Sequence, residues 1–239
     1  MDLLDYVYLC KSTSASHKIL DITGLNSSKL NFDTFIPYTK YENKGIYFYT
    51  IESAQNSTLY VVIEGTHTFS NIIDDLHMPE SYVLPNGVKN GLIQSAWLNM
   101  AKKIKELLDP VILDTDKYTN IVFVGHSMGA AIAMILLILY TPRSIKLLFK
   151  SYAIALPPFC NNVIVSFIDK YVDFIIFNNG DDPVTKMHLY PSECTYITKN
   201  IIWLTPKELS LNLANHCADD YIKNIKLLYK NSALLNQVD

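Results

Sequence analysis

The chain has 239 residues, of which 49% are hydrophobic and 18% are charged, a composition typical of a globular protein that excludes a disordered one. This length suits one domain with a large core, so we predict a single domain over residues 1–239. The net charge is −3, and Arg143 is the single arginine beside nineteen lysines. Because nucleic-acid recognition relies on arginine forks and a basic surface, we expect no nucleic-acid partner.

The N-terminus carries Asp2 and Asp5 where a secretion signal needs positive charge. The four cysteines are scattered, without C-x-x-C spacing: Cys10, Cys160, Cys194 and Cys217. This pattern favours a reduced, intracellular chain over a disulfide framework. We therefore expect a cytoplasmic protein without a signal peptide or transmembrane segment, and at most peripheral at membranes. Cys217 lies beside His216, but no second pair of ligands supports a metal site.

Apolar patterns predict the early elements. Ile46–Ile51 and Thr58–Ile63 are typical of a strand pair joined by a polar turn. A helix is expected from about Gly91 to Leu108, because apolar residues recur along one side of it and lysines cover the other. Pro110 is expected to end this helix.

Strands and helices alternate in the second half of the chain. The predicted elements are a strand over 121–124, a helix over 130–139, strands over 151–156, 172–177 and 196–204, and a closing helix over 219–235. Such alternation favours an α/β fold with a mostly parallel sheet, in which chemistry collects at the carboxyl ends of the strands.

Residues 121–140 are nearly all apolar and could be read as a transmembrane span. However, Gly125, His126, Ser127 and Gly129 interrupt the stretch with a turn. We therefore interpret it as a buried strand followed by a buried helix.

The interrupting residues form the motif Gly125-His126-Ser127-Met128-Gly129. A strand, a G-x-S-x-G turn and a helix make the nucleophile elbow of an α/β hydrolase. The strained turn requires small residues around the serine and presents its hydroxyl above the sheet edge. The motif therefore predicts an α/β-hydrolase fold with Ser127 as nucleophile.

A serine nucleophile needs a base, and the base needs an acid that orients it, in the chain order Ser, Asp or Glu, His. Asp182 is the preferred acid because it follows a predicted strand and directly precedes a Pro-Val turn, and Asp181 is its main rival. His216 is the preferred base because it precedes the last helix, whereas His188 is expected at the rim.

An acyl-transfer site also needs N–H donors for the developing oxyanion. One candidate is the N–H of Met128, directly after the nucleophile. The second should follow an early strand, where Gly65 allows close backbone approach and Thr66 offers an N–H and a hydroxyl.

Together these motifs resemble the class 3 lipase family, the fungal-type triacylglycerol lipases and their intracellular and diacylglycerol-lipase-like relatives. Gly125–Gly129 is similar to the family's G-H-S-L-G, and Ile63–Thr66 with Asn71 and Asp75-Leu76 to its F-R-G-T…N-W-x-x-D-L. Asp182-Pro183-Val184 resembles the turn that carries the family's acid, and His216 with Tyr221 its terminal H-x-x-x-x-Y.

The resemblance implies Ser127, Asp182 and His216 as the triad, with Thr66 and Met128 as the oxyanion hole. It also implies a lid over residues 68–75, with Phe69, Ile72 and Ile73 on one side, although a short helix packed on the core fits that pattern equally well. Three positions depart from the family pattern: Glu64, Ile72 and Ala130. Of these, Glu64 replaces an arginine beside the predicted oxyanion loop and affects its charge network.

The sequence thus predicts a serine hydrolase that cleaves carboxylic esters of a lipid, an acylglycerol or phospholipid, through an acyl-enzyme. Neither a metal nor a cofactor is expected, and the lid would make transient contact with a membrane or lipid-droplet surface. Two alternatives stay open: a serine esterase or acyltransferase on a non-lipid substrate, and an inactive lipase-like binding protein.

Overall fold

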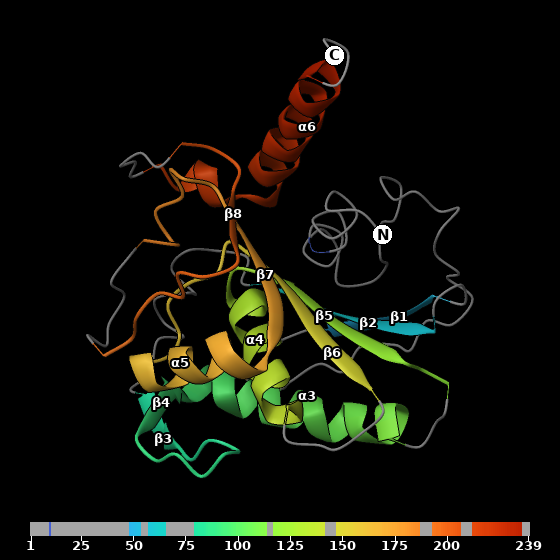
Figure 1. Cartoon of the computed structure of the whole chain (residues 1–239), viewed down its shortest axis with the longest axis vertical. Helices are drawn as coiled ribbons and strands as arrows, with labels where there is room; N and C mark the ends of the chain where they lie inside the picture. The colour runs from blue at the N-terminus through green and yellow to red at the C-terminus, as the bar shows by residue number, and fades with distance from the viewer. Residues whose placement is uncertain are drawn as a thin grey trace.

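A six-stranded sheet forms the centre of the computed structural model, which describes Cys10 and residues 48–53, 57–65, 79–113, 117–141, 147–186, 193–206 and 212–235. Its strand order is β1-β2-β5-β6-β7-β8 (Figure 1). The strands are β1 (Phe48–Ser53), β2 (Thr58–Ile63), β5 (Asn120–His126), β6 (Leu148–Ile154), β7 (Asp173–Asn178) and β8 (Ile201–Trp203). Only β1 is antiparallel to its neighbour, so the carboxyl ends of the other five strands meet at one edge.

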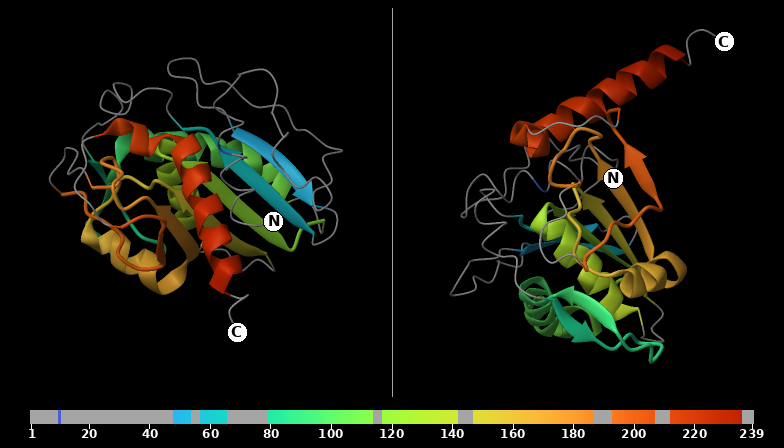
Figure 2. Two further views of the ribbon diagram at one scale, coloured as in Figure 1. Left: turned by 90° about the horizontal axis from the view of Figure 1, so that it is seen from above. Right: turned by 90° about the vertical axis from the view of Figure 1, so that its left-hand side faces the viewer.

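Helices cover both faces of this sheet. One face packs against α3 (Ser95–Leu113), α4 (Met128–Tyr140) and α5 (Asn162–Tyr171), and α6 (Ala218–Leu235) lies against the other (Figure 2). A two-stranded sheet of β3 (Pro79–Tyr82) and β4 (Gly91–Gln94) flanks α3 and α5. The short helix η1 (Leu213–His216) precedes α6.

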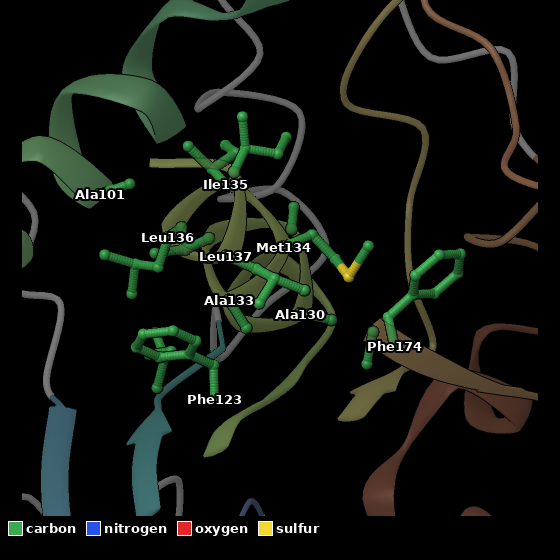
Figure 3. Close-up of a cluster of buried hydrophobic side chains, with 14 of the residues drawn as sticks. Ala101, Phe123, Ala130, Ala133, Met134, Ile135, Leu136, Leu137 and Phe174 are labelled. Carbon is green, nitrogen blue, oxygen red and sulfur yellow. The ribbon is translucent and has the colours of Figure 1, made fainter. Parts of the chain in front are cut away.

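The helix α4 is enclosed by protein on all sides. Every residue from Met128 to Ile138 is buried, and so is Tyr140. Figure 3 shows its side chains between Ala101 of α3, Phe123 of β5 and Phe174 of β7. Burying an aliphatic side chain contributes about 1.5–3 kcal/mol, so this uniformly apolar helix anchors the core. Its start, directly after Ser127, is fixed by the same packing.

The α/β-hydrolase fold predicted from the sequence is confirmed by this layered, mostly parallel architecture. The apolar run 121–140 forms β5 and α4, as interpreted, and none of the helices among the described residues is long and apolar enough to cross a membrane. The predicted late strand is shorter than expected, because only Ile201–Trp203 pairs with β7. The helix α5 was not predicted.

The predicted helix over 91–108 was wrong at both ends. Residues 91–94 form β4, because the backbone there pairs with β3 and Gln94 N–H donates to Phe159 O at 2.9 Å. At the other end α3 continues through Pro110 to Leu113. Proline removes one hydrogen bond, but burial of Ile112, which is 1% exposed, favours one further turn.

Candidate active site

Ser127 occupies a sharp turn between β5 and α4. Its backbone has φ 59° and ψ −126°, a left-handed conformation that is strained for a residue with a side chain. The turn is tied down on both sides, since Ser127 N–H donates to Ile154 O at 3.0 Å and Ser127 O accepts from Ala130 N–H at 2.9 Å. This geometry matches the nucleophile elbow that the motif predicts.

The glycines of the motif are required by close backbone contacts. A Cβ on Gly129 would lie 2.4 Å from Ile63 O, at the end of β2. A Cβ on Gly125 would lie 2.2 Å from the carbonyl carbon of Gly129. Because real Cβ atoms do not approach so closely, only glycine lets α4 start this near the neighbouring strand.

Three polar side chains form a continuous hydrogen-bonded chain at the carboxyl edge of the sheet. Ser127 Oγ lies 2.8 Å from His216 Nε2, and His216 Nδ1 lies 2.9 Å from Asp182 Oδ2. Ser127 is 1% exposed, Asp182 is fully buried, and the His216 side chain is 13% exposed. With Nδ1–H donating to the carboxylate, Nε2 accepts the serine hydroxyl proton, which is the arrangement of a Ser-His-Asp triad.

The carboxylate of Asp182 is held by donors from two elements. Oδ1 accepts from Val184 N–H at 2.9 Å, and Oδ2 accepts from Tyr221 Oη at 2.8 Å. Burial, followed by the charge of Asp182, raises the pKa of Tyr221 well above its ordinary value, so the phenol stays protonated and donates. Sequence reasoning named Tyr221 only through the family resemblance, and the structure places it against the acid.

The carboxylate of Asp181, the rival acid, binds residues other than His216. Its Oδ1 accepts from Thr205 Oγ1 at 3.1 Å and its Oδ2 accepts from Asn215 Nδ2 at 2.9 Å. The geometry therefore favours Asp182 as the carboxylate that contacts His216. His188, the rival base, lies outside the described residues.

His126 contacts the base from within the elbow. Its Nε2–H donates to the carbonyl oxygen of His216 at 2.8 Å, and the two rings lie 4.9 Å apart. Burial and the neighbouring His216 lower the pKa of His126 to about 3, so its ring is neutral. Sequence reasoning missed this bond between His126 and His216, for which a single sequence carries no signal.

Met128, the predicted oxyanion donor, is the first residue of α4, so its N–H has no acceptor within the helix. The positive end of the helix dipole points to the same place. Glu64, at the end of β2, is buried. The other predicted donor, Thr66, and the lid candidates Phe69, Ile72 and Ile73 lie outside the described residues.

The arrangement suits acyl transfer. It supplies a serine hydroxyl, an imidazole base within hydrogen-bonding distance, a buried carboxylate behind the base and a helix N-terminus for an oxyanion. Within the described ranges, no group of three or more His, Cys, Asp or Glu side chains is arranged to hold a metal ion.

The chain resembles known proteins in sequence and in fold. The family model described as Lipase (class 3) matches residues 60–191, which is more than half of the chain. No curated protein sequence matches the chain.

Several solved structures are similar in fold. Rhizomucor miehei triacylglyceride lipase superposes with a TM-score of 0.67 at 16% identity, over 86% of this chain and 79% of the lipase. A triacylglycerol lipase from Penicillium expansum gives a TM-score of 0.59 at 18% identity, over 81% and 75%. A third, a triacylglycerol lipase with a serine protease triad at its catalytic centre, gives 0.63 at 19% identity, over 81% and 74%.

Proposed function

Because the chain belongs to the class 3 lipase family, a family of carboxylic ester hydrolases, we propose that it cleaves ester bonds of a lipid with Ser127, His216 and Asp182 as its catalytic triad. The observation that carries this proposal is the unbroken path Asp182 Oδ2, His216 Nδ1 and Nε2, Ser127 Oγ, with separations of 2.9 and 2.8 Å. The 2.8 Å distance between His216 Nε2 and Ser127 Oγ allows direct proton transfer between base and nucleophile, and the 2.9 Å distance lets Asp182 orient the base.

In the acylation step, Ser127 Oγ attacks the ester carbonyl carbon while His216 Nε2 takes its proton. The imidazolium that forms is stabilised by Asp182, whose buried carboxylate keeps Nδ1 protonated and the ring oriented. The tetrahedral oxyanion accepts a hydrogen bond from Met128 N–H, and Thr66 is the proposed second donor. His216 then protonates the leaving alcohol, which departs and leaves an acyl-enzyme.

Deacylation reverses these roles. Water replaces the alcohol, His216 takes a proton from it, and the resulting hydroxide attacks the acyl carbon. The second tetrahedral intermediate collapses, Ser127 Oγ regains its proton from His216, and a carboxylic acid leaves. No step requires a group beyond the triad, the oxyanion donors and water.

The first experiment is labelling of the purified full chain with a fluorophosphonate, which reacts only with an activated serine. Ser127→Ala should abolish labelling, and His216→Ala should lower kcat on an ester by on the order of 10⁴-fold or more. Asp182→Asn keeps the shape of the acid but stabilises the wrong tautomer of the histidine, so a loss of about 10⁴-fold is expected.

Ser166→Ala is the matched control, because Ser166 is an exposed serine of α5 whose hydroxyl donates to Asn162 O. It should label like the wild type. A folded wild type that is not labelled, either in buffer or with detergent micelles present, would contradict the proposal. Labelling that appears only with micelles would support a lid over residues 68–75.

The substrate class is tested with p-nitrophenyl esters of increasing chain length and with emulsified acylglycerols and phospholipid vesicles. A lipase should favour long acyl chains presented at an interface. Activity confined to short, soluble esters would instead identify a non-lipid esterase.

A further inference from the structure

Asp181 and Asn215 form a hydrogen-bonded pair between the turn that carries Asp182 and the short helix η1 that carries His216. Asn215 Nδ2 donates to Asp181 Oδ2 at 2.9 Å and to the main-chain oxygen of Asp181 at 3.4 Å. Asp181 directly precedes the proposed acid, and Asn215 directly precedes the proposed base. The pair therefore joins the turn and the short helix at the positions adjacent to the triad.

Asp181 is itself anchored to the segment that follows β8. Its Oδ1 accepts from Thr205 Oγ1 at 3.1 Å, and the same hydroxyl accepts from Gly180 N–H at 2.7 Å. A Cβ on Gly180 would lie 2.0 Å from Pro206 O, so the turn before Asp181 rests directly on this segment. The Asp181 carboxylate that accepts the hydrogen bond from Asn215 is thus itself held in place by the segment after β8.

The backbone on both sides of His216 is held as well. The carbonyl oxygen of Asn215 accepts from Asn179 Nδ2 at 3.1 Å, and that of His216 accepts from His126 Nε2 at 2.8 Å. Asn179 Oδ1 in turn accepts from Asn224 Nδ2 of α6 at 3.1 Å. With the Asn215 side chain bound to Asp181, three contacts fix the peptide units from which the imidazole projects.

We propose that Asp181 is a positioning residue, which acts through Asn215 to hold His216 where its ring reaches both Asp182 and Ser127. The proposal rests on the proposed function and assigns different tasks to two adjacent carboxylates: Asp182 contacts the base, and Asp181 holds the short helix that carries it. A catalytic constellation has to be held within about 0.5 Å, which contacts around the triad supply.

The decisive variant is Asn215→Asp, which sets two carboxylates against each other where an amide now donates. We expect it to lower kcat on a short p-nitrophenyl ester by about 10- to 100-fold, as a displacement near 1 Å does. Adding Asp181→Asn restores one donor and one acceptor to the pair, and the double variant should recover most of the lost kcat. The double variant keeps the new carboxylate of residue 215 beside His216. Recovery of kcat would therefore show that the loss in Asn215→Asp came from the broken hydrogen-bonded pair and not from the new charge.

KM and the melting temperature are measured alongside kcat, because a general loss of structure would change them too. Thr205→Val removes the hydroxyl that donates to Asp181 and accepts from Gly180 N–H, so it should lower the melting temperature and should lower kcat less than Asn215→Asp does. Asp173→Ala is the matched control, since Asp173 is an exposed aspartate paired with Lys150 at 3.4 Å, and it should leave kcat unchanged. The low-field proton resonance of His216 Nδ1–H gives a readout independent of turnover, and it should weaken in Asn215→Asp and return in the double variant.

Wild-type kcat in Asn215→Asp, or a double variant no more active than Asn215→Asp, would overturn the proposal. An active wild type that is silenced by Ser127→Ala would then leave the proposed function standing. An inactive wild type would overturn both.

Discussion

Ser127 and His216 are held in place by different kinds of interaction. The elbow around Ser127 is fixed by close backbone contacts with β2 and by the buried helix α4. The short helix that carries His216 is fixed by partly buried hydrogen bonds, two from side chains to its main-chain oxygens and one from the Asn215 side chain to Asp181. We therefore expect substitutions near Ser127 to act through added side-chain volume. Substitutions near His216 should act through lost hydrogen bonds and through pH.

The largest expected effect tests the volume side of this comparison. Gly129→Ala adds a Cβ that would lie 2.4 Å from Ile63 O and 2.8 Å from Glu64 O, so backbone has to move. We expect the free energy of unfolding to fall by about 3 kcal/mol, with loss of fluorophosphonate labelling, measured by urea denaturation and by the probe.

Gly87→Ala is the matched control for this substitution. Gly87 has φ +80°, but no atom lies within 4 Å of the position that an added Cβ would take, so the substitution brings conformational strain without the collision. It should lower the free energy of unfolding by about 1 kcal/mol and leave fluorophosphonate labelling intact. Equal losses of unfolding free energy in Gly129→Ala and Gly87→Ala would show that the elbow has room for an added Cβ.

The next effect tests the hydrogen-bonding side. Tyr221→Phe removes the hydroxyl that donates to Asp182 at 2.8 Å and accepts from Asn179 N–H at 3.0 Å. Because a buried N–H loses its partner, we expect a loss of about 1–3 kcal/mol in unfolding free energy. We also expect a lower kcat, since Asp182 loses one of the donors that fix it.

Tyr140→Phe separates these two consequences. Tyr140 is equally buried, and its hydroxyl donates to Asp109 at 2.9 Å, on α3. It should destabilise the fold and leave kcat unchanged. If both variants keep full kcat, the Tyr221 hydroxyl has only a structural role.

The smallest expected effect, counted per pH unit, concerns His126. The pKa of His126 is about 3 in the folded chain and 6.5 ordinarily, so between these values the unfolded chain binds a proton that the folded chain does not. Above about pH 6.5 the ring is neutral in both states and does not change the unfolding free energy. As the pH falls from 6.5 toward 3, proton binding to the unfolded chain lowers the unfolding free energy. His126→Asn should make the pH dependence of unfolding free energy shallower, by at most about 1.4 kcal/mol per pH unit.

Urea denaturation of both proteins at pH 7, 6 and 5 measures this difference. Parallel pH profiles for the two proteins would contradict the assignment of a strongly lowered pKa to His126.

The sequence predicted those parts of the molecule that are governed by local patterns. The alternation of apolar runs predicts the parallel sheet, and the small residues around Ser127 predict a strained turn, because both depend on neighbours in sequence. The strand Gly91–Gln94 was missed because its pairing with Pro79–Tyr82 and its bond to Phe159 are tertiary contacts.

The chain order Ser, Asp or Glu, His also predicted Asp182 and His216, which the structure brings together with Ser127. The sequence favoured Asp182 over Asp181 only through the Pro183-Val184 turn that follows Asp182, since adjacent aspartates share the other local signals. What distinguishes them is the direction of each carboxylate, and this is decided by Thr205, Asn215 and Tyr221, which lie 24 to 39 residues away in sequence.

The complete enclosure of α4 has a consequence for hydrogen exchange. Backbone amides of a helix that is buried on all sides exchange with deuterated water only when the whole fold opens, whereas those of a loop exchange through local opening. The amides of residues 132–140 should therefore be among the slowest in the chain, and their exchange gives the free energy of global unfolding directly. Exchange in Asn212–Cys217, measured in the same sample, would give the free energy of releasing His216 alone.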